Sequence, residues 1–276
     1  MTLGRRTLPA NLADAARSGV PIGLLMLAAG LSAARPVVLI ALVAGLAVAI
    51  RRHAPVRWAW AAPIPIAVNL CWGLLAAPLA DPLGGDCTDL DSPPAVWRAT
   101  EAVLALGSLA LLAHILRARR SDLGLRWPAR WVVRLAIVGA VVLGPTGLVL
   151  GAWLARPFFG AFELDLSRPG FLVPALVFAV ANGVMEELAY RGALLGWTSR
   201  VTGTGLALVG QAVVFGLAHA SGGDVGGSPV LLGVALGLGG LLAGLITVRT
   251  RSLLVPIAWH VALDLPLYVY LACRVP

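Results

Sequence analysis

Long apolar segments follow one another along almost the whole chain, and this pattern restricts the possible folds most strongly. A helix that crosses a bilayer needs about 20 mostly apolar residues. Nine segments have this character: 18–34, 36–50, 58–80, 99–116, 135–155, 171–190, 203–220, 229–248 and 252–272. The first two are short and separated by Arg35-Pro36, so they form a hairpin, two crossings or one broken helix. We expect an all-α polytopic membrane helix bundle with about eight or nine transmembrane helices.

The composition excludes the ordinary soluble classes of protein. Of the 276 residues, 59% are hydrophobic and only 12% are charged, whereas soluble domains have roughly 45–50% and about 25%. So few charges do not cover the surface of a soluble globule. The composition therefore indicates a multi-pass protein of the cell membrane, whose first partner is the lipid bilayer.

The basic residues indicate how the chain is oriented. All 21 are Arg, against 13 acidic residues, and they lie between the apolar segments, as membrane orientation requires, rather than in a nucleic-acid-binding patch. Arg-rich connections occur at 5–17, 51–57, 117–134 and 249–251, while 81–98 carries four Asp and one Arg. Alternation over nine segments places every Arg-rich connection on one side. We expect a cytoplasmic amino terminus and no nucleic-acid partner.

The three cysteines are far apart and form no CxxC pair. Neither a disulfide framework nor a thiolate metal site is therefore predicted. The cysteines are Cys71, Cys87 and Cys273.

The Arg-rich segment 117–134 is the best internal boundary. We expect amino-terminal membrane helices of unknown role over 1–134 and a second helix bundle over 135–276, with its core at about 171–268. In the second part, Gly233-xxx-Gly237 and Gly240-xxx-Gly244 predict close helix packing.

Ionisable residues are unevenly distributed among the apolar segments. A charge at the centre of a membrane helix costs about 2.5–3.5 kcal/mol on insertion scales. The first five segments hold almost none: Glu101 begins one, where we expect it to reach the headgroups, and His114 lies near an end. The last four hold Glu186, Glu187, Arg191, His219, His260 and Asp264. These six side chains are expected to face one another or water.

Helical spacing groups these residues further. Residues four apart share a helix face, and the pairs with this spacing are Glu187 with Arg191, Phe215 with His219, and His260 with Asp264. Glu186 lies about 100° round the helix from Glu187. One carboxylate can therefore pair with Arg191 while the other remains free for proton transfer.

Each pair alone has a plain structural explanation. A Glu-Glu-xxx-Arg run is commonly a salt-bridged helix end, and a single membrane His is commonly a packing residue. The pair of His260 and Asp264 is less easily explained, because two ionisable groups share one face of an apolar helix. All three pairs together, in a chain with almost no other intramembrane charge, favour a functional site.

The three motifs resemble those of the CPBP intramembrane proteases, which include type II CAAX-prenyl endopeptidases and abortive-infection-like bacterial proteins. The motifs are Glu186-Glu187-Leu188-Ala189-Tyr190-Arg191-Gly192, Phe215-Gly216-Leu217-Ala218-His219 and His260-Val261-Ala262-Leu263-Asp264. Their order and spacing are similar to the family's over roughly 171–268. Each motif is weak singly, but the ordered set is specific.

The resemblance implies a role for each matching residue. Glu186 would act as general base on a water molecule, assisted by His219. Glu187 would be a second carboxylate, fixed by Arg191. His260 and the residue at position 264 would stabilise the oxyanion of the tetrahedral intermediate.

Asp264 departs from the family pattern, because CAAX endopeptidases typically have Asn there. An ionised Asp cannot donate to an oxyanion. In this chain it is therefore either protonated or orients His260 through a hydrogen bond. Asp occurs at this position in bacterial relatives, so the departure affects the role assigned to residue 264 more than it affects the family assignment.

The residues fit direct hydrolysis better than covalent catalysis. Ser221 is the only hydroxyl close in sequence to a candidate histidine, and no Ser-His or Cys-His couple is evident. Glu186, His219 and His260 could hold a divalent ion such as zinc, although the HExxH motif is absent. We favour a water activated by glutamate without a cofactor and keep the metal as the alternative.

The predicted function is that of an intramembrane endopeptidase acting on a membrane-embedded or lipid-linked peptide. The alternatives are a non-catalytic membrane scaffold or immunity-type protein and a proton-coupled transporter. Assembly of the site needs the helix of 171–190 to continue to about Trp197, because only then do the glutamates lie near mid-membrane. The sequence predicts no oligomeric state.

Overall fold

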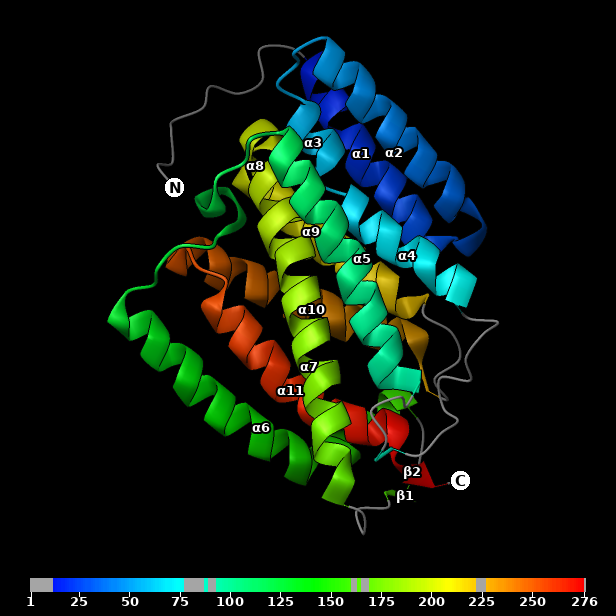
Figure 1. Cartoon of the computed structure of the whole chain (residues 1–276), viewed down its shortest axis with the longest axis vertical. Coiled ribbons are helices and arrows are strands. Elements are labelled where there is room, and N and C mark those ends of the chain that lie inside the picture. Colours follow the sequence, from blue (N-terminus) through cyan, green and yellow to red (C-terminus); the bar gives the residue numbers. More distant parts are fainter. Residues whose placement is uncertain are drawn as a thin grey trace.

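The computed structural model describes residues 12–76, 87–88, 93–159, 163–164, 169–221 and 227–275. They form a bundle of helices (Figure 1). The helices are α1 (Leu12–Gly30), α2 (Arg35–Arg51), α3 (Arg57–Ala61), α4 (Ile64–Ala76), α5 (Pro93–Ile115), α6 (Arg130–Phe159), α7 (Leu172–Glu186), α8 (Gly196–Thr202), α9 (Thr204–Ala220), α10 (Pro229–Thr250) and α11 (Leu254–Ala272). Shorter helical turns are η1 (Ser32–Ala34), η3 (Arg120–Leu123) and η4 (Pro169–Phe171), and η5 (Glu187–Leu195) is a π-helix. β1 (Glu163–Leu164) pairs antiparallel with β2 (Arg274–Val275).

The predicted all-helical, multi-pass fold is confirmed. Within the described residues, six helical runs are long and apolar enough to cross a membrane, and the apolar helices 19–30 and 204–220 are shorter. The predicted eight or nine crossings thus remain an approximate count. The first two apolar segments form separate helices, α1 and α2, which lie side by side as a hairpin (Figure 1).

Proline divides the third apolar segment. α3 ends at Ala61, and the turn at Ala62 and Pro63 separates it from α4. Proline has no N–H to donate and its ring crowds the preceding turn. The segment is therefore two shorter helices rather than one continuous span.

Glycine-lined contacts bring the carboxyl-terminal helices close together. On α9 and α10, a Cβ at Gly233 would meet Ala220, and a Cβ at Gly244 would meet Leu208 and Gln211. The predicted close packing at the two Gly-xxx-Gly motifs is therefore confirmed.

The long helix α6 packs against α11 and leaves most of its other side chains facing outward. Gly139, Gly147 and Gly151 receive side chains of α11, because a Cβ at these positions would overlap Trp259, Pro266 and Tyr270 respectively. The outward side chains of α6 are apolar and exposed, as a lipid-facing surface requires: Val138, Val141, Val142 and Val149.

The Arg-rich connections meet at one end of the bundle. The backbone N–H of Leu253 donates to the Gly124 carbonyl at 3.3 Å, and Arg200 forms an ion pair with Asp122. The Arg200 guanidinium also lies 4.2 Å from the ring centroid of Trp58. Segments from both predicted parts of the chain therefore contact one another here, and the division into 1–134 and 135–276 stays a prediction.

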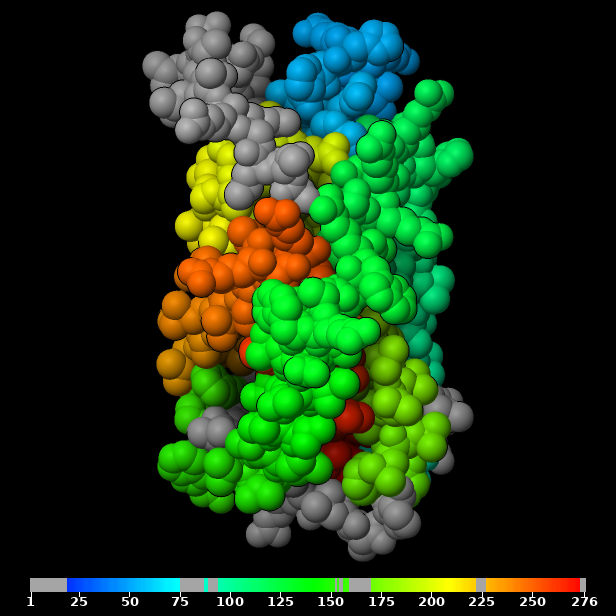
Figure 2. Space-filling view, turned by 90° about the vertical axis from the view of Figure 1, so that its left-hand side faces the viewer, coloured from blue at the N-terminus to red at the C-terminus, as the bar shows by residue number. Residues whose placement is uncertain are grey.

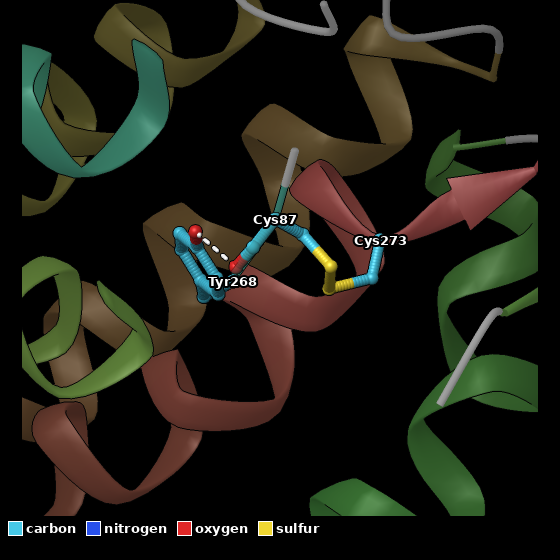
Figure 3. The surroundings of a disulfide bond; sticks show 3 residues. All are labelled: Cys87, Tyr268 and Cys273. Atoms are coloured by element: carbon cyan, nitrogen blue, oxygen red, sulfur yellow. Dashed lines mark hydrogen bonds between the residues drawn. A yellow bond between two sulfur atoms is a disulfide. The ribbon is translucent and has the colours of Figure 1, made fainter. Parts of the chain in front are cut away.

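A disulfide lies at the opposite end of the bundle. Cys87 is bonded to Cys273, and the Tyr268 hydroxyl donates to the Cys87 carbonyl at 3.0 Å (Figure 3). The sequence predicted no disulfide framework, and this bond corrects that prediction for Cys87 and Cys273, because folding brings together residues that are far apart in sequence. Cys71 is free. Disulfides persist outside the reducing cytosol, so the bond favours the same orientation as the arginines.

Candidate active site

One continuous helical run carries both glutamates. α7, η5 and α8 follow one another without a break over Leu172–Thr202, a run of 31 residues. The expected extension to Trp197 is therefore present, and Glu186 and Glu187 lie near the middle of the run. The π-helical segment begins at Glu187. Such segments are rare and frequently occur at functional sites.

A glycine on α7 allows α11 to approach the glutamates. A Cβ added at Gly183 would lie 2.9 Å from a methyl carbon of Val261 and 3.5 Å from the Cβ of His260. Any larger residue at Gly183 would therefore push α11 away. This close approach positions His260 against the helical turn that carries Glu186 and Glu187.

Glu187 links the first and third motifs. Its Oε1 accepts a hydrogen bond from Arg191 Nη1 at 2.9 Å and another from His260 Nδ1 at 2.7 Å. Glu187 is only 1% exposed and Arg191 3%. The predicted pairing of Glu187 with Arg191 is present, and it also fixes the orientation of the His260 ring.

Glu186 lies between the two histidines without a hydrogen bond to either. Its Oε1 is 3.8 Å from His219 Nε2, and its Oε2 is 3.6 Å from His260 Nε2. Both distances exceed the 2.7–3.2 Å of an N–H···O bond. Glu186 Oε2 is buried and has no hydrogen-bond partner in the described part of the chain. The free carboxylate oxygen is therefore surrounded by groups that can share a proton with it.

The backbone fixes which nitrogen of His219 faces Glu186. His219 Nδ1 lies 2.8 Å from the Phe215 carbonyl oxygen, which only accepts, so Nδ1 carries the hydrogen. In the neutral ring, Nε2 is then an acceptor. Two acceptors, Glu186 Oε1 and His219 Nε2, thus face each other. A water molecule, which has two O–H donors, can satisfy both.

Asn182 belongs to the cluster and was not predicted from the sequence. Its Nδ2 donates to Asp264 Oδ2 at 2.8 Å and lies 3.5 Å from His260 Nε2. His260 Nε2 is 3.5 Å from the same Asp264 oxygen. Asn182 precedes Glu186 by four residues in an otherwise apolar helix, and this spacing was the available signal.

Phe215 contacts two side chains of the cluster. The Arg191 guanidinium carbon is 4.4 Å from the Phe215 ring centroid, and the His219 ring centroid is 4.5 Å from it. Gly240 lies beside both Arg191 and Phe215, where a Cβ would crowd them. The aromatic face attracts the cation and helps to hold Arg191 and His219 in place.

The expectation that Glu101 reaches the headgroups is wrong. Glu101 is 5% exposed, because its Oε1 accepts from Trp97 Nε1 at 2.9 Å and its Oε2 from Arg98 at 2.6 Å. Arg98 also lies over the ring of Phe178 on α7, 5.6 Å from its centroid. An intrahelical pair therefore neutralises Glu101 inside the bundle.

The described side chains do not offer a ready metal site. Among the residues that the structure describes, no group of three or more His, Cys, Asp or Glu has a spacing that would hold a metal ion. Glu186, His219 and His260, the predicted ligand set, are included in that statement. We therefore derive no step through a metal.

An apolar hollow lies next to the site, between α6 and α11. Its volume is about 400 Å³, and its lining includes Ala140, Leu148, Val261 and Leu265. Val261 and Leu265 directly follow His260 and Asp264 in the sequence. The hollow thus runs along the helix that carries the third motif.

All six predicted site residues come together in this cluster, on three helical runs: α7–η5, α9 and α11. The catalytic roles of these residues stay predictions. No curated protein matches the chain significantly. A family model described as type II CAAX prenyl endopeptidase Rce1-like matches residues 168–266, which is less than half of the chain and includes the whole cluster. Residues 168–266 of this multi-pass membrane protein are thus similar to the type II CAAX prenyl endopeptidase Rce1-like family.

Proposed function

We propose that the protein is an intramembrane endopeptidase that cleaves a membrane-embedded or lipid-linked peptide with a water molecule activated by Glu186 and His219. The Rce1-like domain supports the reaction class. The observation that carries the mechanism is the Glu186 carboxylate, which is buried, lies between two imidazole Nε2 atoms and has an oxygen without a partner among the described residues.

The first step is attack of water on the scissile carbonyl carbon. The water donates one hydrogen to Glu186 Oε1 and the other to His219 Nε2, so both lone pairs of its oxygen are free. Glu186 takes the proton as the new C–O bond forms, and the carbonyl oxygen becomes an oxyanion. A positioned general base of this kind contributes roughly 10²–10⁴-fold to the rate.

The second step needs a donor to the oxyanion. His260 Nδ1–H is held by Glu187, which is held in turn by Arg191. When both ring nitrogens carry a proton, Nε2–H donates to the oxyanion. Asp264 Oδ2 accepts from the Asn182 amide, and in this mechanism Asp264 acts by orienting that amide and the His260 ring. Glu186 then delivers its proton to the leaving nitrogen as the C–N bond breaks.

A substrate within the bilayer is supported by the surroundings of the site. The apolar hollow between α6 and α11 would accommodate a hydrocarbon chain or an apolar segment next to His260. His219 has 28% of its side chain exposed and Glu186 only 7%, so a peptide would reach the site from the side of His219. We place the amino terminus in the cytoplasm, because the arginines and the disulfide both favour that orientation.

The other functions explain less of the geometry. A scaffold would gain stability from a fully satisfied network, yet Asn182 Oδ1, Glu186 Oε2 and Glu187 Oε2 are buried without hydrogen-bond partners in the described residues. A proton-coupled transporter remains the alternative that uses buried charges, but no feature of the described residues favours it over hydrolysis.

The experiment compares cleavage by wild type and Glu186→Gln in membranes that contain equal amounts of protein. Incubation in ¹⁸O-labelled water followed by mass spectrometry of peptides should show new carboxyl termini with one ¹⁸O in the wild type alone. Glu101→Gln is the matched control, since it removes another buried carboxylate. Equal cleavage by Glu186→Gln and wild type would contradict the proposal.

A further inference from the structure

A small cavity opens at the Arg-rich end of the bundle, away from the apolar hollow. It has a volume of about 140 Å³ and lies between η3, the π-helix, the start of α9 and the end of α10. Figure 2 shows the segment around residue 250 beside the segment around residue 120 on this face. Four arginines line the cavity: Arg126, Arg191, Arg249 and Arg251.

The charge of the cavity is almost entirely positive. Asp122 is the one acidic residue in its lining, and this carboxylate is already engaged by Arg200 and by the backbone N–H of Arg119, 2.7 Å away. Arg249 and Arg251 are exposed, and the structure assigns no carboxylate partner to either among the described residues. Excess cationic groups therefore face the cavity.

Two further features favour an anion. α9 begins at Thr204 in the cavity lining, and its N-cap is Gly203, which has no side chain to satisfy the first N–H groups. Arg191 is buried, and its Nε has no hydrogen-bond partner in the described part of the chain. Because Nη1 of the same guanidinium binds Glu187, Arg191 borders both this cavity and the candidate active site.

We propose that the cavity binds a phosphate group, carried by an anionic phospholipid. Arginine forks suit phosphate oxygens, and the cavity is of headgroup-phosphate size. Its place at the end of membrane-spanning helices puts it at headgroup depth. From the cavity, α10 presents exposed Leu238, Leu242 and Leu245, along which acyl chains can lie. This site is independent of the proposed hydrolysis and borders it only through Arg191.

The test measures lipid binding to the full chain in a zwitterionic detergent. Short-chain phosphatidylglycerol, phosphatidylcholine with the same chains, and inorganic phosphate are added in separate arms, and melting temperature and bound lipid by native mass spectrometry are recorded. The double variant Arg249→Gln/Arg251→Gln removes two cavity arginines. Arg51→Gln/Arg52→Gln is the matched control, because it removes the same charge from the end of α2, outside the cavity lining.

Wild type and the control should bind phosphatidylglycerol at least tenfold more tightly than phosphatidylcholine, with a rise of several degrees in melting temperature. The cavity variant should lose that preference. If it does not fold, Arg126→Gln, in an exposed position, should weaken the preference several-fold. Equal loss in the control would show general surface attraction, and an equal response to inorganic phosphate would show a free-anion site. Either result, or no preference at all, overturns the proposal.

Discussion

Among the residues that the structure describes, two Arg–Glu pairs have a buried carboxylate, one in each half of the chain, and they differ in what else touches that carboxylate. In α5, Glu101 binds Arg98 with one oxygen and Trp97 with the other. In the π-helix, Glu187 binds Arg191 and His260 through one oxygen, and its second oxygen has no partner among the described residues. Both oxygens of Glu101 are bonded within a single helix, whereas Glu187 connects to α11 through His260.

The comparison shows that burial of a charged pair does not by itself indicate a reactive site. Both carboxylates have a cation within one helical turn, because an unpaired charge in the membrane interior is energetically costly. Glu187 of the second pair shares His260 with a further carboxylate, Glu186, which lies between two imidazoles without a hydrogen bond to either. Incomplete satisfaction of the neighbours is therefore the feature that separates a candidate site from a structural pair.

The largest effect is expected from Glu186→Gln. The amide keeps the shape but cannot accept the proton of water, so kcat/KM should fall at least ~10³-fold, within the range of a lost general base. Because a neutral amide is easier to bury than a carboxylate, the melting temperature in detergent should stay near that of wild type. Unfolding of Glu186→Gln with activity retained in any folded fraction would reverse this assignment.

Arg191→Ala should lower stability and activity together. Removal of Arg191 leaves the buried Glu187 charge uncompensated, which should lower the free energy of unfolding by about 3–5 kcal/mol. Glu187, which accepts the hydrogen bond from His260 Nδ1, is then no longer held in place. Arg191→Lys should restore only part of the stability and activity lost in Arg191→Ala, because the point charge of an ammonium group replaces the planar guanidinium. Urea titration of reconstituted protein measures the loss. Arg200, an arginine of the same helical run with 27% of its side chain exposed, provides the control: Arg200→Ala should cost less than ~1 kcal/mol.

Asn182→Leu tests whether the amide positions the third motif. Loss of a hydrogen bond to a charged group costs about 1.5–3 kcal/mol, and a displacement of His260 by about 1 Å lowers kcat by up to ~10²-fold. Gln211 is the control, since this fully buried amide of α9 donates to the Gly240 carbonyl. Gln211→Leu should lower stability while kcat of the folded protein is unchanged. Equal kcat for Asn182→Leu and wild type argues against a positioning role.

In the Arg98–Glu101 pair, Glu101→Gln should change stability and activity little. The amide oxygen can still accept from Trp97, and Arg98, with 27% of its side chain exposed, can turn outward. We expect a loss of less than ~1 kcal/mol in stability and unchanged kcat, measured by the same assays. A loss of activity as large as that of Arg191→Ala would mean that the two pairs are not distinct in function.

The smallest effect is expected from metal removal. Dialysis of purified wild type against a strong chelator should leave the cleavage rate within about twofold of the untreated sample, because the proposed base is Glu186 itself. Metal content by mass spectrometry before and after dialysis shows that the treatment worked. Loss of activity that zinc restores would favour the alternative in which Glu186, His219 and His260 hold an ion.

The cluster was predictable because charge inside a membrane is costly and therefore rare. Glu186, His219 and His260 stand out against apolar helices, and their spacing assigns faces. Asn182 does not stand out in this way, because an amide carries no charge and its partner Asp264 lies on another helix. The burial of Glu101 depends on Arg98, three residues away, and on where α5 packs. The burial of Glu101 therefore cannot be inferred from a single apolar segment, and the only signal for Asn182 was its spacing of four residues from Glu186.

The disulfide places a condition on the order of synthesis. Cys87 and Cys273 are 186 residues apart in sequence, and ribosomes add roughly 5–20 residues per second. The Cys87 thiol therefore waits on the order of 10–40 s before its partner exists. During that interval Cys71 is the only other thiol in the emerging chain. Cys71 lies on the apolar helix α4, so insertion of α4 into the membrane before Cys273 is made would separate its thiol from that of Cys87.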